Sequence, residues 1–214
     1  GKRGLALANL ASLPHISIAG AVATGTHGSG DGNRSLAAAV AAVELMTADG
    51  EVVARRRGEP DFDGFVVSLG ALGIVTAVEL DVEPAYEVAQ TVYEQLPFEG
   101  VVDDLAAVTS LGYSTSLFTT WQHPEVIDQL WLKRRVDAGG EAPASVLGAA
   151  PATVAWHRVA AAELDPDGGR GSACGQSVPA GGGAGRAGGA GGAAVPKGRR
   201  LRLVPAGVRA VVRG

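Results

Sequence analysis

Side chains that could hold a charged ligand gather between residues 12 and 30. Hydroxyl groups recur there at short intervals, on Ser12, Ser17, Thr24, Thr26 and Ser29. The residues from Ala19 to Ala23 are small, so a backbone at this point can come close to a flat or charged ligand. A turn of this composition that enters a short helix exposes several free N–H groups, which suit a pyrophosphate. The segment predicts phosphate or nucleotide binding and does not select the nucleotide.

The elements that must position this segment alternate between strands and helices. Residues 43–47 alternate like a half-buried strand, and Asp49 followed by Gly50 predicts the turn of a hairpin that returns through residues 52–54. Residues 60–69 predict a helix with an acidic first turn. Residues 74–82 alternate into a further strand, which Pro84 ends.

A second group of elements follows a boundary that we expect near Pro84. It consists of strands at residues 88–93, 114–121 and 129–136, with a helix at 97–110. Trp121, Trp131 and Trp156 are expected in the core, and the arginines at 55–57 are expected to be a solvated end of the hairpin.

Composition excludes several classes of protein. The chain has 214 residues, 46% of them hydrophobic and 19% charged, which is typical of a soluble globular protein. No apolar run reaches the length of about 18 residues that a membrane span needs. Cys174 is the single cysteine, so neither a disulfide framework nor a cysteine metal cage is expected. Nothing argues for export, and we expect a cytoplasmic protein.

The charge balance changes abruptly after Asp167. All 22 acidic residues lie at or before that position, whereas eight of the 18 basic residues follow it. The same segment is rich in glycine and alanine and has no period that could bury a face, so we expect disorder there. One hypothesis is a frameshift between about residues 151 and 167, because GC-rich DNA read out of frame yields this composition; the other is a natural glycine-rich linker. The segment has the charge for nucleic acid but no aromatic residue to stack on bases, so no nucleic-acid partner is expected.

Four ordered motifs resemble a known family. They are Leu13-Pro14-His15-Ile16-Ser17-Ile18-Ala19-Gly20, Thr26-His27-Gly28-Ser29-Gly30, the run from Val43 to Gly50, and Ser68-Leu69-Gly70-Ala71-Leu72-Gly73-Ile74-Val75-Thr76. Together they resemble the alditol (xylitol) oxidases, FAD enzymes of the vanillyl-alcohol-oxidase (PCMH-type) superfamily that are related to the aldonolactone oxidases. The run from Trp131 to Val136 is similar to the start of their substrate domain. The resemblance covers residues 1 to about 150.

The resemblance implies an α+β fold. Residues 1–84 would be the second subdomain of a PCMH-type FAD-binding domain, 85–150 the start of a substrate domain on an antiparallel sheet, and 151–214 a disordered tail. FAD would be the cofactor, with contacts from the residues that match the motifs: Ser12, Ser17, Gly20, Ala21, Val22, Ala23, His27, Gly28, Ile74 and Val75. Ser12 would also touch the bound polyol. No metal site is implied.

The implied reaction is the oxidation of a polyol CH–OH group by oxygen, which gives an aldehyde and hydrogen peroxide. The histidine that links the flavin in this family would lie before Gly1, and the Glu, Arg and Lys that bind and deprotonate the polyol would lie after the tail begins. The catalytic residues are therefore expected outside this chain, which looks like a fragment that is inactive when isolated. A fragment of an aldonolactone oxidase and a non-catalytic product of a broken gene remain as alternatives. The implied partners are a polyol and oxygen, with no membrane.

Overall fold

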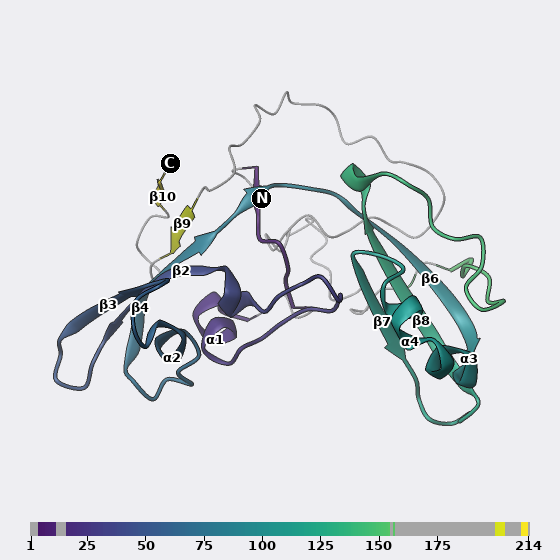
Figure 1. Ribbon diagram of the computed structural model, residues 1–214, viewed down its shortest axis with the longest axis horizontal. Helices are drawn as coiled ribbons and strands as arrows, with labels where there is room; N and C mark the ends of the chain where they lie inside the picture. The colour runs from purple at the N-terminus through teal and green to yellow at the C-terminus, as the bar shows by residue number, and fades with distance from the viewer. Residues whose placement is uncertain (1–3, 12–15, 155, 157–199, 204–210, 214) are drawn as a thin grey trace. The chain divides into compact units, whose positions relative to one another are not determined.

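The computed structural model describes residues 4–11, 16–154, 156, 200–203 and 211–213 (Figure 1). Its contacts divide the chain into two compact units. Unit 1 comprises residues 1–28, 34–85 and 192–214, and unit 2 comprises residues 29–33 and 86–191. The main change of unit along the chain thus falls between Ala85 and Tyr86.

Unit 1 is built on an antiparallel sheet with the strand order β10-β9-β4-β2-β3. Its strands are β2 (Val40–Met46), β3 (Val52–Arg56), β4 (Ile74–Asp81), β9 (Arg200–Leu203) and β10 (Val211–Arg213). The expected hairpin joins β2 to β3, and the amide of Gly50 donates to the carbonyl of Thr47 at 3.0 Å to close its turn. A separate two-stranded pair joins β1 (Leu5–Ala6) to β5 (Glu83–Pro84).

One face of this sheet carries the core of unit 1. The buried side chains come from β2, β4 and three short helical segments, α1 (Ile18–Ala23), η1 (Leu36–Ala39) and α2 (Phe62–Val66). Val40 and Leu80 are fully buried at its centre. The helix expected at residues 60–69 is confirmed only in its middle, because Val67 and Leu69 leave helical geometry and Leu69 has a φ of 52°.

Unit 2 holds the antiparallel sheet β6-β8-β7. Its strands are β6 (Val88–Pro97), β7 (Ser114–Phe118) and β8 (Val126–Arg135), and the short helix η2 (Val136–Ala138) follows β8. Tyr93, Leu130 and Leu132 are fully buried in its core. The three strands confirm those expected from the sequence.

The helix expected at residues 97–110 is two helices, α3 (Phe98–Asp103) and α4 (Leu105–Thr109). Asp104 separates them because its backbone leaves helical geometry, with φ −138° and ψ 57°. Its carboxylate accepts a hydrogen bond from the amide of Ala107 at 3.1 Å and so caps α4. The apolar pattern runs through the break, since Val101 and Val108 are both buried in one core.

The structure places all three tryptophans, for which we expected core positions, and Trp156 is partly buried. Trp131 is buried as expected, whereas Trp121 is 68% exposed, has a φ of 60° and lies at the edge of the Phe98 ring, 6.2 Å between centroids. Trp121 follows β7 in a loop, and its amide donates to the hydroxyl of Thr119 at 3.0 Å. The expectation of a core position was wrong for Trp121, because the strand ends at Phe118 and the alternation does not reach it.

A short loop early in the chain belongs to unit 2. The side-chain amide of Asn33 donates from Nδ2 to the carbonyl of Tyr113 at 2.8 Å and to that of Ser29 at 2.9 Å. The hydroxyl of Ser29 shares hydrogen bonds with those of Ser114 and Ser116, at 2.5 and 3.0 Å. Residues 29–33 are therefore fixed to β7 and to the turn before it by side-chain hydrogen bonds.

The segment expected to be disordered contains two strands. Arg200–Leu203 forms β9, which pairs with β4, and Val211–Arg213 forms β10, which pairs with β9. Here the expectation of a structureless tail does not hold, because Arg-Leu-Arg-Leu alternates in the period of a strand. Residues 157–199 and 204–210 lie outside the described part of the chain, and so does most of the stretch from about 151 to 167 in which we hypothesise a frameshift.

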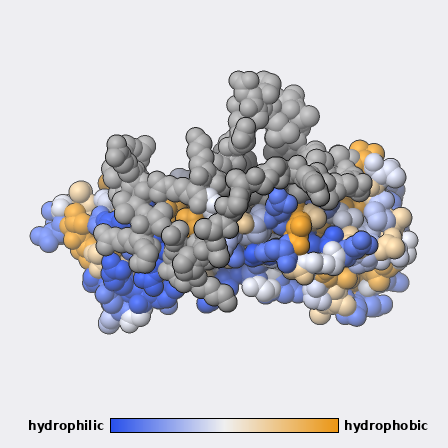
Figure 2. Space-filling view, turned by 90° about the horizontal axis from the view of Figure 1, so that it is seen from above, coloured by the Kyte–Doolittle hydropathy of each residue, from blue (hydrophilic) through white to orange (hydrophobic). Residues whose placement is uncertain are grey.

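The described surface mixes polar and apolar residues. Figure 2 shows apolar residues in separate small groups among hydrophilic ones on the face that it draws. No helix among the described residues is long and apolar enough to cross a membrane.

Candidate functional site

The candidate site begins at helix α1, in the hydroxyl-rich segment. Ser17 is the N-cap of the helix, and its hydroxyl accepts a hydrogen bond from the amide of Gly20 at 3.1 Å. The amide of Ala21 donates to the carbonyl of Ser17 at 3.0 Å. Two of the N–H groups that the sequence suggested for a pyrophosphate are therefore used inside the helix itself, and Ser17 serves first as a cap.

The small residues of α1 divide between the core and the surface. Ala21 and Val22 are buried and pack in the core of unit 1, so their side chains hold the helix against the sheet. Gly20 is exposed, and a Cβ there would meet the Ser17 hydroxyl at 3.0 Å. A ligand could reach this helix through Gly20 and Ala23, and not through the side chains of Ala21 and Val22.

The chain after α1 is fixed by short hydrogen bonds. The Thr24 hydroxyl donates to the carbonyl of Gly20 at 2.9 Å and lies 2.9 Å from the Thr26 hydroxyl. Nδ1 of His27 lies 3.0 Å from the carbonyl oxygen of Gly28. A Cβ at Gly28 would overlap the side chain of Asn9 and the carbonyl of Leu10, so this position requires glycine for close approach.

The second predicted segment, residues 68–76, lies beside the end of α1. The amide of Leu69 donates to the carbonyl of Ala23 at 3.1 Å, which joins the two segments directly. Ile74 is 73% exposed at the start of β4, whereas Val75 is half-buried and packs against the core of unit 1. Several large apolar side chains of this segment are exposed: Val67, Leu69, Leu72 and Ile74.

These residues form an edge on which an apolar ring and a charged group could both rest. The exposed side chains supply apolar surface and the threonines supply hydroxyls, whereas the space beside Gly28 is filled by Asn9 and Leu10. The edge thus fits the parts of FAD in chemical type. Ser12 lies outside the described residues, so its expected contacts with flavin and polyol stay predictions. The roles of the other predicted contacts stay predictions too.

Among the described residues, the two groups with a clearly shifted pKa are both in unit 2: burial raises the pKa of Tyr93, and a hydrogen bond from Arg135 lowers that of Asp137. The described residues contain no cluster of His, Cys, Asp and Glu that could hold a metal ion.

The sequence did not predict the backbone hydrogen bond that joins Leu69 to Ala23. The signal was the pair of glycines at 70 and 73, which follow directly after the helix expected at residues 60–69. A Cβ at Gly73 would overlap the backbone carbonyl of Met46, and its φ is 141°. Gly73 therefore lets the loop cross the end of β2 before β4 begins, which places Ile74 and Val75 next to Met46 and Leu45.

Comparison with known proteins first defines a class. Residues 1–55 match the family described as FAD binding domain. This match covers the hydroxyl-rich segment, α1 and the hairpin, and the predicted FAD cofactor is confirmed by it. The chain thus carries part of an FAD-binding domain, in an α+β fold with antiparallel sheets.

The similarity to particular proteins is more specific. The chain is 57% identical over 156 residues to alditol oxidase from Streptomyces sp. strain IKD472, which covers 73% of this chain and 36% of that protein. It is 32% identical over 126 residues to D-arabinono-1,4-lactone oxidase from Eremothecium gossypii, covering 58% of this chain and 23% of that protein. It is 40% identical over 85 residues to L-gulono-1,4-lactone dehydrogenase from Mycobacterium tuberculosis, covering 40% of this chain and 20% of that one. The predicted resemblance to the alditol oxidases is confirmed, and the chain spans about a third of the length of the alditol oxidase it matches.

Proposed function

We propose that this chain is part of an FAD-dependent oxidase that acts on the CH–OH group of a polyol. The observation that carries the proposal is the 57% identity to an alditol oxidase over 156 residues, compared with 41% over 90 residues and 32% over 126 residues to two D-arabinono-1,4-lactone oxidases, the first of them putative. In the proposed reaction an alcohol and oxygen give an aldehyde and hydrogen peroxide, so two hydrogens leave the carbon and its hydroxyl and both appear in peroxide. When bound, FAD would accept the hydride from carbon and pass the electrons to oxygen.

The described residues would contribute binding and orientation. We propose that unit 1 is the second part of the FAD-binding domain, where the exposed side of α1 and the segment 67–74 would receive the flavin. Ser12, Ser17, His27 and Ile74 would lie at this edge, with Ser12 also near the polyol. Unit 2 would be the start of the substrate domain. The cytoplasm is the proposed location, supported by a sequence with a single cysteine and hence no disulfide framework.

A chimera tests the proposal on a complete enzyme. The matching 156 residues of the Streptomyces alditol oxidase would be replaced by those of this chain. We expect the chimera to retain flavin absorbance and to produce peroxide with xylitol and not with an aldonolactone. A folded chimera that retains flavin but makes no peroxide from xylitol would contradict the assignment to the alditol oxidases. A folded chimera that lacks flavin would support the product of a broken gene.

A charge introduced at α1 tests the proposed cofactor edge. Ser17→Asp keeps a residue that caps helices well but places a negative charge beside Gly20, where it would repel a pyrophosphate. Ser35→Asp is a matched control, because Ser35 is also an N-cap, of η1, and its side chain makes no cap bond. We expect Ser17→Asp to lower FAD retention of the chimera roughly tenfold, as the loss of about 1.4 kcal/mol requires, and Ser35→Asp to leave it unchanged. Equal retention in both variants would remove Ser17 from the site.

A further inference from the structure

The edge of β4 that faces away from β2 is paired with β9. On each face of the sheet, the side chains of β9 match those of β4 in charge or in apolar character. β9 pairs with β4 in antiparallel register, so that Arg200 is opposite Asp81 and Leu203 is opposite Val78. Arg200 and Arg202 point to one face of the sheet, and Leu201 and Leu203 point to the other. Next to β4, β9 therefore places basic side chains on one face of the sheet and apolar side chains on the other.

The charged face of β4 and β2 carries what we call the acidic row, which is Glu44, Glu79 and Asp81. Nη2 of Arg202 lies 2.8 Å from the carboxylate of Glu44, whose other oxygen accepts from the Thr76 hydroxyl at 2.8 Å. Arg200 lies 3.5 Å from Glu79 and 3.4 Å from Asp81. The two arginines of β9 thus reach all three carboxylates of the acidic row.

Two further arginines reach the acidic row from the end of β3, on the side of the sheet opposite to β9 in the strand order. Nη1 of Arg57 lies 2.7 Å from Asp81, and Nη1 of Arg56 lies 3.7 Å from Glu79. Arg56 and Arg57 are exposed, as expected for a solvated end of the hairpin, and each also pairs with a carboxylate. Glu79 is only 10% exposed, and Arg56 is its one remaining cationic neighbour among the described residues if β9 is removed. β9 is therefore needed to pair the buried carboxylate well.

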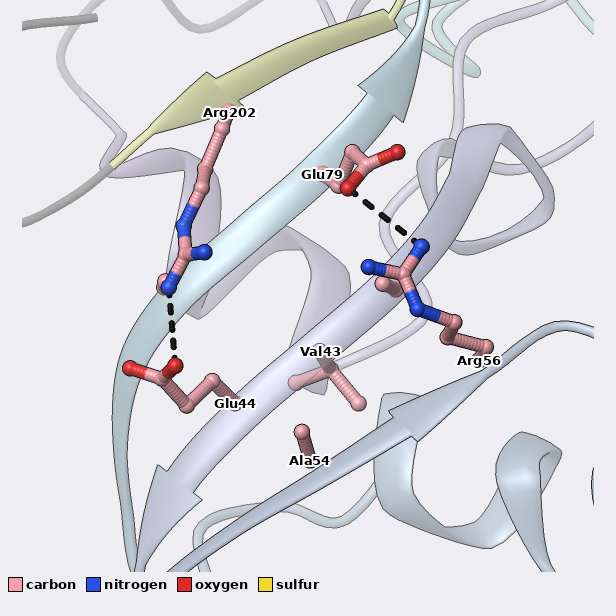
Figure 3. A pocket seen from close by; sticks show the side chains of 8 residues that line it. Val43, Glu44, Ala54, Arg56, Glu79 and Arg202 are labelled. Carbon is pink, nitrogen blue, oxygen red and sulfur yellow. Dashed lines mark hydrogen bonds and ion pairs between the residues drawn. The ribbon is translucent and has the colours of Figure 1, made fainter. Parts of the chain in front are cut away.

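A shallow hollow lies between the ion pair of Glu44 with Arg202 and that of Glu79 with Arg56 (Figure 3). It is lined by the small residues Ala42, Ala54 and Ala77, by Val43, and by the charged residues Glu44, Glu79, Arg56 and Arg202. Figure 3 shows Arg202 reaching from β9 to Glu44 and Arg56 reaching towards Glu79. Because alanines leave this space open, long side chains from an added strand can extend over the sheet.

The apolar face of β9 packs against the core of unit 1. Leu203 packs against the core cluster that contains Val78 and Leu80. Without a strand at this edge, the backbone groups of β4 between Val78 and Asp81 that face β9 would lose their partners, whereas those that face β2 would keep theirs. A suitable strand must therefore supply backbone hydrogen bonds, apolar residues on one face and basic residues on the other.

We propose that the outer edge of β4 is a strand-addition site for an extended peptide in which basic and apolar residues alternate. Arg200–Leu203 occupies the site from within the chain and shows the type of ligand that it takes. A partner protein with the pattern basic-apolar-basic-apolar would compete for the same edge. The specificity resides in the acidic row and does not depend on flavin or on the proposed oxidase activity.

The test uses the full chain with Arg200→Glu and Arg202→Glu, which repels β9 from the acidic row. The probe is a fluorescent peptide with the sequence Gly-Arg-Arg-Leu-Arg-Leu-Val-Pro of residues 198–205, and binding is measured by anisotropy. We expect the variant to bind the probe at least about tenfold more tightly than the wild type, whose own strand occupies the edge. A probe with glutamates in place of the arginines at 200 and 202 should bind the variant at least about tenfold more weakly than the basic probe. A higher salt concentration should weaken the binding of the basic probe to the variant.

A compensating variant separates charge selection from general unfolding. Glu44→Arg combined with Arg202→Glu reverses the 2.8 Å pair, so β9 should return to the edge and probe binding should fall towards the wild-type value. On the wild type, Glu44→Gln with Glu79→Gln should speed amide exchange in β9 by roughly fivefold or more. Equal binding of the basic and acidic probes would overturn the proposal, and so would unchanged exchange in β9.

Discussion

The most exacting test of the described geometry is the substitution Gly73→Ala. Gly73 lies at the point where the loop after α2 crosses the end of β2, and its φ of 141° belongs to a region that L side chains rarely adopt. An added Cβ would overlap the carbonyl oxygen of Met46, which is a backbone atom of the neighbouring strand and cannot rotate away. The substitution therefore forces either the loop or the pairing of Ile74 with Met46 to move.

The magnitude follows from two contributions. Backbone strain of this type costs about 1–3 kcal/mol, and displacement of the β2–β4 pairing adds to it, so we expect a loss of about 3 kcal/mol or more for unit 1. Gly70→Ala is the matched control in the same loop. Its φ is 77° but no atom lies near its would-be Cβ, so about 1 kcal/mol is expected from the backbone alone.

The assay must report unit 1 by itself. All three tryptophans lie in unit 2, so their fluorescence does not follow the sheet of unit 1. Hydrogen exchange measured on peptides from β2 and β4 does, and about 3 kcal/mol corresponds to roughly a hundredfold faster exchange when opening is at equilibrium. The reasoning is refuted if Gly73→Ala and Gly70→Ala accelerate exchange equally, or if Gly73→Ala leaves β2 and β4 unchanged.

Three further predictions concern unit 2. Tyr93→Phe should cost about 1 kcal/mol, measured by urea unfolding, because the buried hydroxyl donates to the carbonyl of Pro143 at 2.6 Å. Burial raises the pKa of Tyr93, so the wild type should lose stability as pH rises above the ordinary value of 10.0 and Tyr93→Phe should lose less; identical alkaline profiles would contradict this. The hydrogen bond from Arg135 lowers the pKa of Asp137 from its ordinary value of 3.8. The small contribution of this pair to the stability of the fold is therefore present above that pH and is lost as the pH falls below it. An acid titration of Arg135→Gln followed by NMR should show a higher pKa for Asp137. Asn33→Ala removes two hydrogen bonds and should raise protease sensitivity at residues 29–33, whereas Asn33→Asp should restore no protection, since its carboxylate cannot donate to the Tyr113 carbonyl.

Much of the fold was predictable because its signals are local. Asp49-Gly50 between alternating residues predicts the β2–β3 hairpin, and the alternation from Ile74 onwards predicts β4. The apolar residues of β6 and β8 likewise indicated buried strands. In each case neighbouring residues in the sequence decide both the conformation and the buried face.

The rest depends on contacts between residues far apart in the sequence. The short strand β9 gains its place from carboxylates more than a hundred positions earlier, such as Glu44, and no local signal points to them. The break at Asp104 is local but opposed by apolar residues that run through it. At the candidate site, the segments 17–28 and 68–76 were predicted from motifs, whereas their direct link between Ala23 and Leu69 needed the loop geometry at Gly73.

The loop of residues 29–33 has a consequence for dividing the chain. The obvious cut, between Ala85 and Tyr86, would leave this loop on one piece and its partners Tyr113 and Ser114 on the other. The same cut would also separate β9 from β4. Each piece would then lack something that the other carries, so the two halves of a gene split at this position should be produced together, as complementary pieces, and neither half is a self-sufficient module.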